Sequence, residues 1–383
     1  MSVKTRSHAR VSLGSGGDTD YYLKNIGWGC IVNVTLESIY FECSIFENQK
    51  NEINYTTVLN QDDPYLIQHL LLENNSFQKV QKSIVKDQTT FLLEGEEQIV
   101  KYNDILNNTK DQSTINNLEL DGGMLDLIKA TITYVNPQFS KDLQIKTNIP
   151  RESGLGGSSV LNVALLLALI KDQGKLTNPE ELAQAAYTIE RNIMDVPGGY
   201  QDQWAAAYGR GLNYMIFKQG KVEVHPINIT AQNLEKLEKN SLLVYFSRRT
   251  NTGSKVHEDQ KRMIEENPKY LQKLMLEKRA NAIKVKEALE KGNFTKFAKH
   301  VNKDWEIKQK LSAKISVRDE IYKTALENGA LAGRLCGAGS GGTYYFYCEE
   351  GKKEKVLKSI KHLILKNLPF KIQRPTQAGA KLL

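Results

Sequence analysis

The sequence Pro150-Arg-Glu-Ser-Gly154-Leu155-Gly156-Gly157-Ser158-Ser159 is followed at once by the apolar run Val160–Ile170. This pattern predicts a glycine-rich turn that opens a buried helix. The first N–H groups of a helix lack an intrahelical acceptor, and the helix dipole favours negative charge there, so such a turn suits a phosphate group. Ser158 and Ser159 would supply hydroxyls for phosphate oxygens or for Mg²⁺. Taken alone, the stretch fits a simple cap of a buried helix equally well.

The composition is that of an ordinary soluble protein. The chain has 383 residues, enough for two domains, with 40% hydrophobic and 25% charged residues. Its four cysteines lie far apart and form no C-x-x-C pair, which predicts reduced thiols rather than a disulfide framework or a zinc site. The N-terminus shows no signal peptide, and the longest apolar run is too short to span a bilayer. We therefore expect a cytoplasmic protein with no membrane partner.

The net charge of +8 narrows the class of ligand. A positive balance suits anionic small molecules, and it also occurs in proteins that bind nucleic acid. Here the basic residues are spread along the chain and mixed with acidic ones, without a dense basic arm. We therefore expect a small anionic ligand and no nucleic acid.

A second glycine-rich segment lies near the N-terminus, at residues 8–21. It is expected to begin as a short strand and then to break into a loop that carries Asp18 and Asp20. The two carboxylates would suit sugar hydroxyls, and Arg10 would suit a phosphate or a carboxylate. The alternative is a turn held by local side-chain hydrogen bonds.

Two acidic residues follow the central segment. Asn178 and the proline after it predict the start of a helix over residues 178–191, with Glu190 near its C-terminal end. The helix dipole disfavours a carboxylate there, so Glu190 is expected to have a partner, either a cation or a salt-bridging side chain. Asp202 stands between two glutamines. It would either cap the following turn or accept a proton.

A third glycine-rich segment precedes the expected strand Thr343–Cys348, and it reads Gly337-Ala338-Gly339-Ser340-Gly341-Gly342. It matches G-x-G-x-x-G, but a dinucleotide site needs that pattern after a strand and at the start of a helix. A Rossmann site is therefore rejected. The Walker P-loop and the protein-kinase motif set are also absent from the sequence.

The remaining segments predict a mixture of strands and helices. Strands are expected at 29–46 (or a hairpin there), 139–147, 213–217, 221–229, 241–247 and 370–373, and helices at 122–134, through most of 255–329 and at 352–363. The polar region 47–120 is expected to form short helices, exposed strands and loops.

The three glycine-rich segments, in this order, resemble the motifs of the GHMP kinases, the family named for galactokinase, homoserine kinase, mevalonate kinase and phosphomevalonate kinase. The central family motif Pro-x-x-x-Gly-Leu-Gly-Ser-Ser is matched by Pro150–Ser159. The first motif is matched by Arg10–Tyr21, and the third by Gly337–Gly342. Within the family, the segments Ile189–Arg191 and Pro197–Gly209 are most similar to the bacterial D-glycero-D-manno-heptose 7-phosphate kinases. Galactokinases and fucokinases are the related alternatives.

The resemblance implies an α+β fold of two lobes with the site in the cleft between them. Residues 1–211 would form the ATP-binding domain, similar to the second domain of ribosomal protein S5, and residues 212–383 a ferredoxin-like C-terminal domain. The implied activity is phosphorylation by ATP of the anomeric hydroxyl of a sugar or sugar phosphate. D-glycero-D-manno-heptose 7-phosphate, converted to the 1,7-bisphosphate, is the first choice of substrate. The expected assembly is a monomer or a homodimer.

The resemblance also implies roles for single residues. The ATP phosphates would be bound by Gly154, Leu155, Gly156, Gly157, Ser158 and Ser159, and Mg²⁺ by Ser158 and Glu190. Asp202 would take the proton of the sugar hydroxyl, with Arg10 beside it. The substrate would be contacted by Asp18, Asp20, Tyr21, Gly199, Arg248 and Arg249. The third glycine-rich segment would approach the phosphates or the active-site loop.

Besides a nucleic-acid-binding protein, which the scattered charge disfavours, two other kinds of function are alternatives to a kinase. A non-catalytic sensor of sugar and ATP on the same fold need not retain Asp202, Ser158 and Glu190 together, so their joint presence favours an enzyme. A decarboxylase of the same superfamily is disfavoured by the sugar-type first motif.

Overall fold

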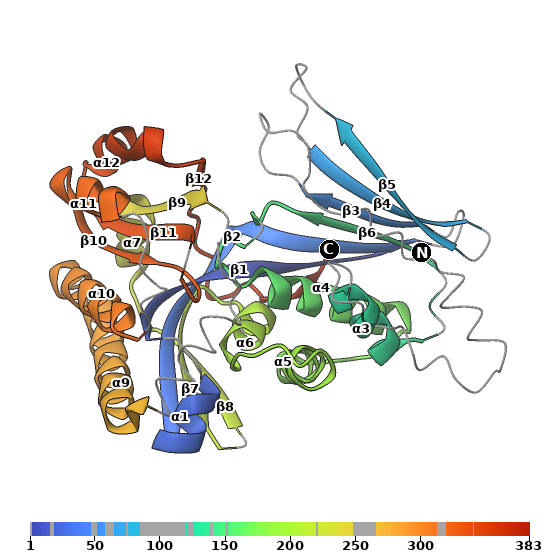
Figure 1. The fold of residues 1–383 in the computed structure, drawn as a ribbon, viewed down its shortest axis with the longest axis horizontal. Helices are drawn as coiled ribbons and strands as arrows, with labels where there is room; N and C mark the ends of the chain where they lie inside the picture. Colours follow the sequence, from blue (N-terminus) through green and yellow to red (C-terminus); the bar gives the residue numbers. More distant parts are fainter. Residues whose placement is uncertain are drawn as a thin grey trace.

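The structure is a computed structural model, and it describes residues 2–15, 19–46, 52–57, 65–73, 76–84, 120, 126–137, 139, 141–150, 152–219, 221–247, 266–311, 319–339 and 341–383. These residues form two β-sheets with helices packed on both (Figure 1). The architecture is the two-lobed α+β fold expected from the sequence.

The larger, nine-stranded sheet is built around two long strands, β1 (Val3–Ser15) and β2 (Trp28–Phe46). Both are rich in the β-branched and apolar residues that favour a buried strand. One half of β2 pairs with β6 (Asp142–Thr147) and the other half with β7 (Leu212–Lys218), so β2 is one strand rather than a hairpin. The remaining strands are β3 (Glu52–Thr57), β4 (Tyr65–Glu73), β5 (Ser76–Ile84), β8 (Lys221–Pro226) and β13 (Lys381–Leu382).

A bulge interrupts the pairing of β1 with β2 beside Arg10. His8 pairs with Tyr40, whereas Arg10 pairs with Thr35, so residues 36–39 of β2 lie opposite a single residue of β1. Bulges bend a strand and change the direction in which a side chain points, and they are common next to active sites.

Helices cover one face of this sheet (Figure 1). α4 lies directly against β1 and β2, and its residues Ser159–Leu169 are buried on every side because other helices cover it from outside. A helix that is apolar all round is stable only inside a core. The helices on this face of the sheet are α4 (Gly157–Asp172) and, packed on it, α3 (Asp126–Val135), α5 (Pro179–Thr188) and α6 (Gln201–Tyr208). α5 starts as predicted, with Asn178 in a capping box.

The smaller sheet has four antiparallel strands in the order β10-β11-β9-β12. The described elements follow one another as β-α-β-β-α-β, which together with this strand order is the ferredoxin-like arrangement predicted for the C-terminal lobe. The strands are β9 (Ser241–Ser247), β10 (Ala330–Leu335), β11 (Gly342–Cys348) and β12 (Lys366–Leu368). The helices are α7 (Ala231–Asn240), α9 (Pro268–Glu290), α10 (Phe294–Gln309), α11 (Asp319–Glu327) and α12 (Lys353–Ile360), with a 3-10 turn at Lys361–Leu363.

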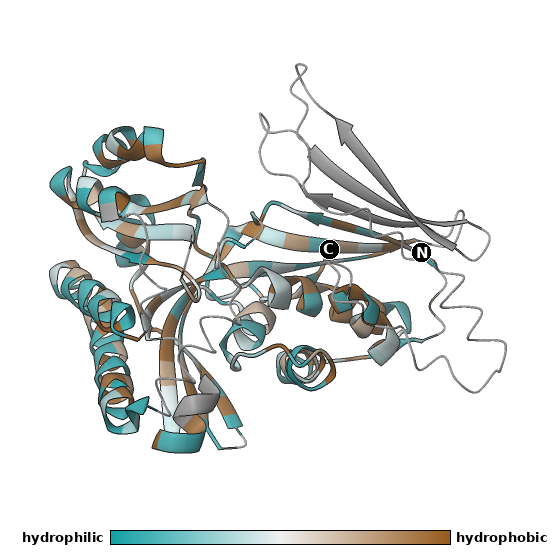
Figure 2. Cartoon of the chain, in the orientation of Figure 1, coloured by the Kyte–Doolittle hydropathy of each residue, from teal (hydrophilic) through white to brown (hydrophobic). Residues whose placement is uncertain are grey.

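The two sheets share one hydrophobic core. Successive residues of β9 point to opposite faces of its sheet. Leu243 and Tyr245 therefore pack in the core of the larger sheet, together with Val285 of α9. Leu242 and Val244 face the other way, into a second core under α11 and α12. Figure 2 shows hydrophobic residues along the strands and mixed faces on the helices. The smaller sheet is thus buried on both faces.

Sheet pairing divides the chain differently from the expected domain limits, 1–211 and 212–383. β7, β8 and β13 all belong to the nine-stranded sheet. A division by sheets therefore places residues 212–226 and 381–382 with the N-terminal lobe.

Three local expectations from the sequence need comment. The first strand starts at Val3. The helix α1 (Thr19–Ile26) replaces the end of the expected loop. Residues 370–373 form no strand, since Ile372 makes only an isolated bridge to Leu36. In the region 47–120 the described elements are the strands β3, β4 and β5, and most of the rest lies outside the described residues. Within the described residues, no helix has both the length and the apolarity needed to cross a bilayer.

Candidate active site

The loop before α4 has the conformation of an anion site. Gly154 and Gly156 have φ values of +81° and +79°, in the left-handed region that favours glycine. Gly156 is the N-cap of α4, and no side chain caps this helix. The first intrahelical hydrogen bond runs from the Val160 amide to the Gly156 carbonyl at 3.0 Å. The amides between them point out of the helix start, where a phosphate group can bind.

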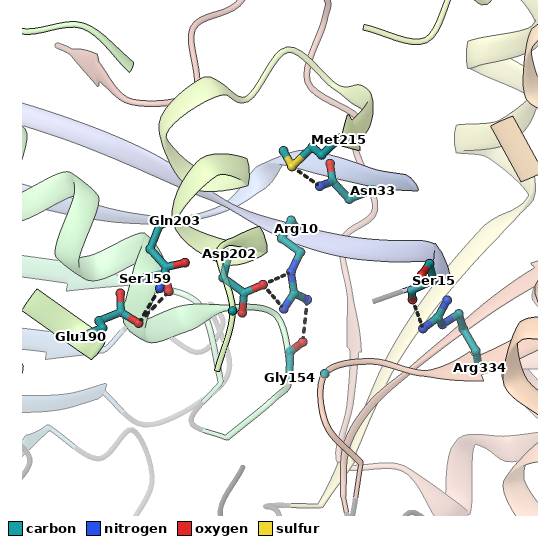
Figure 3. Close-up of polar contacts among 12 residues, drawn as sticks. Arg10, Ser15, Asn33, Gly154, Ser159, Glu190, Asp202, Gln203, Met215 and Arg334 are labelled. Atoms are coloured by element: carbon teal, nitrogen blue, oxygen red, sulfur yellow. Dashed lines mark hydrogen bonds and ion pairs between the residues drawn. The ribbon is translucent and has the colours of Figure 1, made fainter. Parts of the chain in front are cut away.

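Arg10 joins the strand β1 to this loop (Figure 3). Its side chain is buried, and its Nη1 donates to the Gly154 carbonyl at 2.9 Å. Its Nε and Nη2 donate to the same oxygen, Oδ1 of Asp202, at 2.9 and 2.7 Å. The Arg10 amide also donates to the Leu155 carbonyl at 3.3 Å. A buried guanidinium thus fixes both the loop and the carboxylate.

Asp202 lies in the first turn of α6, whose N-cap is Tyr200, so it does not cap the helix itself. Both Arg10 donors reach Oδ1, and no described donor reaches Oδ2. A Cβ built on Gly156 would lie 3.6 Å from this Oδ2. The second carboxylate oxygen therefore faces the N-cap of α4, beside the proposed phosphate site. Of the two roles left open by the sequence, capping of the helix is not observed, and proton acceptance stays a prediction.

Glu190 lies in a single π-turn (Ile189–Ile193) that continues α5. Turns of this kind are frequent at functional sites. Its buried carboxylate accepts hydrogen bonds from Ser159 Oγ at 3.0 Å, Gln203 Nε2 at 3.0 Å and Asn162 Nδ2 at 3.3 Å. Arg191 Nη1 lies 3.8 Å away. Burial raises the pKa of the Glu190 carboxyl, although the Arg191 charge and the hydrogen bonds lower it. In the structure, the partners of Glu190 are thus three neutral hydrogen-bond donors, with the Arg191 guanidinium at a longer distance.

The two serines at the start of α4 differ in their surroundings. Ser158 is exposed, whereas Ser159 is buried and donates to Glu190. A hydroxyl and a carboxylate are hard oxygen ligands of the kind that Mg²⁺ takes, and a buried carboxylate with a raised pKa gains from a nearby cation. In the part of the chain that the structure describes, no group of three or more His, Cys, Asp and Glu side chains could hold a metal. A cation at Ser158 and Glu190 would therefore need phosphate oxygens and water as further ligands.

The third glycine-rich segment touches the central one. Gly342 has a φ of +103°, and a Cβ built on it would lie 2.6 Å from the Ser153 carbonyl oxygen. Only glycine allows this approach of the two backbones. The Cys336 amide donates to the Thr343 carbonyl at 2.8 Å, which closes the segment at its base. The segment between β10 and β11 therefore supports the loop that precedes α4.

The end of β1 is held by a buried ion pair of the C-terminal lobe. The Ser15 amide donates to Asp304 Oδ1 at 2.6 Å. Arg334 Nη2 donates to the Ser15 carbonyl at 3.4 Å (Figure 3). Arg334 Nη1 lies 2.7 Å from Asp304 Oδ2. Ser15 itself has a φ of +62°, which is unfavourable for a residue with a side chain.

The structure describes only some of the other residues predicted from the sequence to belong to the site. Gly199 is buried, and its carbonyl accepts from Arg191 Nη2 at 3.2 Å. The backbone of Asp20 and Tyr21 lies in the first turn of α1. The predictions for Asp18, Arg248, Arg249 and Ser340 fall outside the described residues. Gly337, Ala338, Gly339 and Gly341 lie in the turn between β10 and β11.

Several residues of the site carry no obvious sequence signal. Asn162 and Gln203 hold Glu190, and Asp304 and Arg334 hold Ser15. Gln203 adjoins Asp202, and Asn162 lies three residues after Ser159 on one helix, so these two could have been suspected from spacing. Asp304 is buried among elements distant in sequence, where no spacing rule applies.

Two family models match the chain: residues 125–210 match the GHMP kinases N terminal domain, and residues 285–363 the GHMP kinases C terminal domain. The D-glycero-alpha-D-manno-heptose 7-phosphate kinase of Campylobacter jejuni is 35% identical over 248 residues, which cover 62% of this chain and 72% of that protein. The chain therefore belongs to the GHMP kinase family.

Two further proteins extend the comparison. The crystal structure of a D-glycero-D-manno-heptose 1-phosphate kinase from Bacteroides thetaiotaomicron is 25% identical and covers 100% of this chain and 98% of its own, with a TM-score of 0.68. The galactokinase of Pyrococcus furiosus is 22% identical over 277 residues, covering 65% of this chain and 77% of that protein.

Proposed function

We propose that this chain transfers the γ-phosphoryl group of ATP to the anomeric hydroxyl of D-glycero-D-manno-heptose 7-phosphate, giving the 1,7-bisphosphate. The observation that carries the proposal is the Arg10–Asp202 pair, which is bonded to the loop before α4 through the Gly154 carbonyl. It places a carboxylate next to a phosphate-binding helix start, as a kinase acting on a hydroxyl requires. The choice of sugar follows the similarity to the D-glycero-alpha-D-manno-heptose 7-phosphate kinase of Campylobacter jejuni.

Asp202 acts as the general base in this mechanism. Its Oδ1 is held by Arg10, so Oδ2 takes the proton of the anomeric hydroxyl while that sugar oxygen bonds to the γ-phosphorus. The bond between the γ-phosphorus and the bridging oxygen breaks, and ADP leaves. The Arg10 guanidinium also places positive charge beside the phosphoryl group that is being transferred.

The start of α4 binds the ATP phosphates. The amides of Gly157, Ser158 and Ser159 and the helix dipole stabilise their negative charge. Ser158 and Glu190 would hold Mg²⁺, directly or through water, and the ion would supply positive charge that neutralises the phosphates. The exposure of Ser158 and the raised pKa of the Glu190 carboxyl support this assignment.

An assay of ATP consumption tests the proposal. The purified protein is mixed with ATP, Mg²⁺ and each of D-glycero-D-manno-heptose 7-phosphate, mannose, fucose and galactose, and ADP formation is followed. We expect turnover with the heptose phosphate and a new anomeric phosphate in the ³¹P NMR spectrum of the product. Turnover with fucose or galactose alone would reassign the substrate, and no turnover with any sugar would overturn the proposal.

A further inference from the structure

The helix α10 carries a buried lysine that the proposed mechanism does not use. Lys308 donates from Nζ to the Leu335 carbonyl at 2.8 Å and to the Gly337 carbonyl at 2.5 Å. Leu335 ends β10, and Gly337, with a φ of +64°, begins the third glycine-rich segment. The lysine therefore fixes the point at which the chain leaves the sheet toward the active-site loop.

The charges around Lys308 make this arrangement unfavourable for stability. Lys278 and Arg334 are buried in the same region, and both lie near the carboxylate of Asp304, at 3.9 and 2.7 Å. Burial, with the Arg334 and Lys278 charges, lowers the pKa of the Lys308 amine well below its ordinary value. Burial of the Lys308 amine carries a desolvation cost that an apolar side chain of similar length would not carry. The contacts of Lys308 with the Leu335 and Gly337 carbonyls therefore explain its presence better than a contribution to stability does.

The segment held by Lys308 reaches the phosphate loop at its other end. Gly342 packs against the Ser153 carbonyl, where an added Cβ would be only 2.6 Å away. Ser153 directly precedes Gly154, whose carbonyl accepts from Arg10. A displacement at Gly337 would therefore be passed through Gly342 to the backbone that Arg10 and Asp202 contact.

We propose that Lys308 is a positioning residue for phosphoryl transfer: through its two carbonyl contacts it holds the third glycine-rich segment against the loop before α4. This inference rests on the proposed kinase function. It adds a residue of the C-terminal lobe that touches neither nucleotide nor sugar.

The substitution Lys308→Met tests it, because methionine has a similar length and no charge. We expect only a small change in melting temperature, because the loss of two hydrogen bonds offsets the removal of the desolvation cost. We expect kcat to fall by about 10²-fold, since a small misplacement of catalytic groups has effects of this size. The KM for the sugar should stay within about threefold, because Lys308 does not contact it. Hydrogen exchange of the amides from Cys336 to Thr343 should accelerate by about tenfold.

The matched control is Asn302→Ala on the same helix. Asn302 donates to the Leu331 carbonyl and accepts from the Gly333 amide, so it holds the opposite end of β10. We expect a lower melting temperature and unchanged kcat. The inference is overturned if Lys308→Met keeps its kcat within about threefold, or if Asn302→Ala loses as much turnover. If the wild type phosphorylates no sugar, the proposed function fails separately, and unchanged exchange in Lys308→Met then overturns the contact role as well.

Discussion

Replacement of Asp202 by asparagine separates proton transfer from structure. Asparagine removes the counter-charge of the buried guanidinium but keeps an oxygen for the two Arg10 donors that now reach Oδ1, whereas alanine would remove the acceptor as well. Two hydrogen bonds between opposite charges become bonds from a charged donor to a neutral oxygen, which lowers the free energy of unfolding by about 2 kcal/mol. For 383 residues this corresponds to a fall of about 2–3 °C in melting temperature.

The loss of activity should be far larger than this loss of stability. General-base catalysis contributes about 10²–10⁴-fold, or about 3–5 kcal/mol of the activation barrier. We therefore expect kcat of Asp202→Asn to fall by that factor in the ATP-consumption assay. Binding of a non-hydrolysable ATP analogue, measured by calorimetry, should change little, because the amides at the start of α4 are untouched.

The control is Asp195→Asn, the same chemical change in the loop before α6. Asp195 is exposed and has a φ of +50°, which asparagine also tolerates. We expect this variant to retain wild-type turnover. An Asp202→Asn variant with kcat within tenfold of the wild type would refute Asp202 as the base. Loss of analogue binding would show instead that the substitution had disturbed the phosphate loop.

Three further predictions concern the same loop. Gly342→Ala should lower the free energy of unfolding by about 1–3 kcal/mol and reduce kcat, because its Cβ would strike the Ser153 carbonyl; a wild-type melting temperature and kcat would contradict the close approach. Ser158→Ala should raise the Mg²⁺ concentration needed for half-maximal turnover, with little change in the free energy of unfolding. Ser159→Ala should instead lower the free energy of unfolding by about 1–3 kcal/mol, because buried Glu190 loses a donor. The reverse pattern in Mg²⁺ titrations and denaturant unfolding would reject the Ser158 assignment. The raised pKa of Glu190 means that its stabilising contribution is complete below the ordinary value of 4.5 and is lost as the pH rises through the raised pKa. Without Mg²⁺, the free energy of unfolding of Glu190→Gln should therefore fall less steeply above pH 4.5 than that of the wild type. An equally steep fall in both proteins would exclude the buried Glu190 charge as the cause of the pH dependence.

The sequence predicted those parts of the site that depend on local patterns. The glycine-rich stretch before an apolar run predicted a turn that opens a buried helix, and the structure has this turn, with Gly154 and Gly156 in the left-handed region. The capping box at Asn178 follows from four consecutive residues. The two-lobed α+β fold was predicted from the order of the three glycine-rich motifs. That order is a property of the whole chain and not of a single helix or strand.

The parts that sequence reasoning missed depend on contacts between distant segments. The surroundings of Glu190 bring together Ser159, Asn162 and Gln203 from α4 and α6. The clamp at Ser15 brings β1 to Asp304 of α10, 289 residues away in the chain. Strand pairing is another such contact: β7 and β8, within residues 212–226, pair in the larger sheet.

The core shared by the two sheets restricts how the enzyme can move. Leu243 and Val285 lie in that core, and a rigid-body separation of the lobes would expose both to water. Each such side chain opposes its exposure by about 1.5–3 kcal/mol, and several would be exposed together. A hinge opening of the whole lobe would thus be a rare fluctuation. We expect sugar and nucleotide to enter and leave through displacements of loops, while the two lobes keep their relative orientation during turnover.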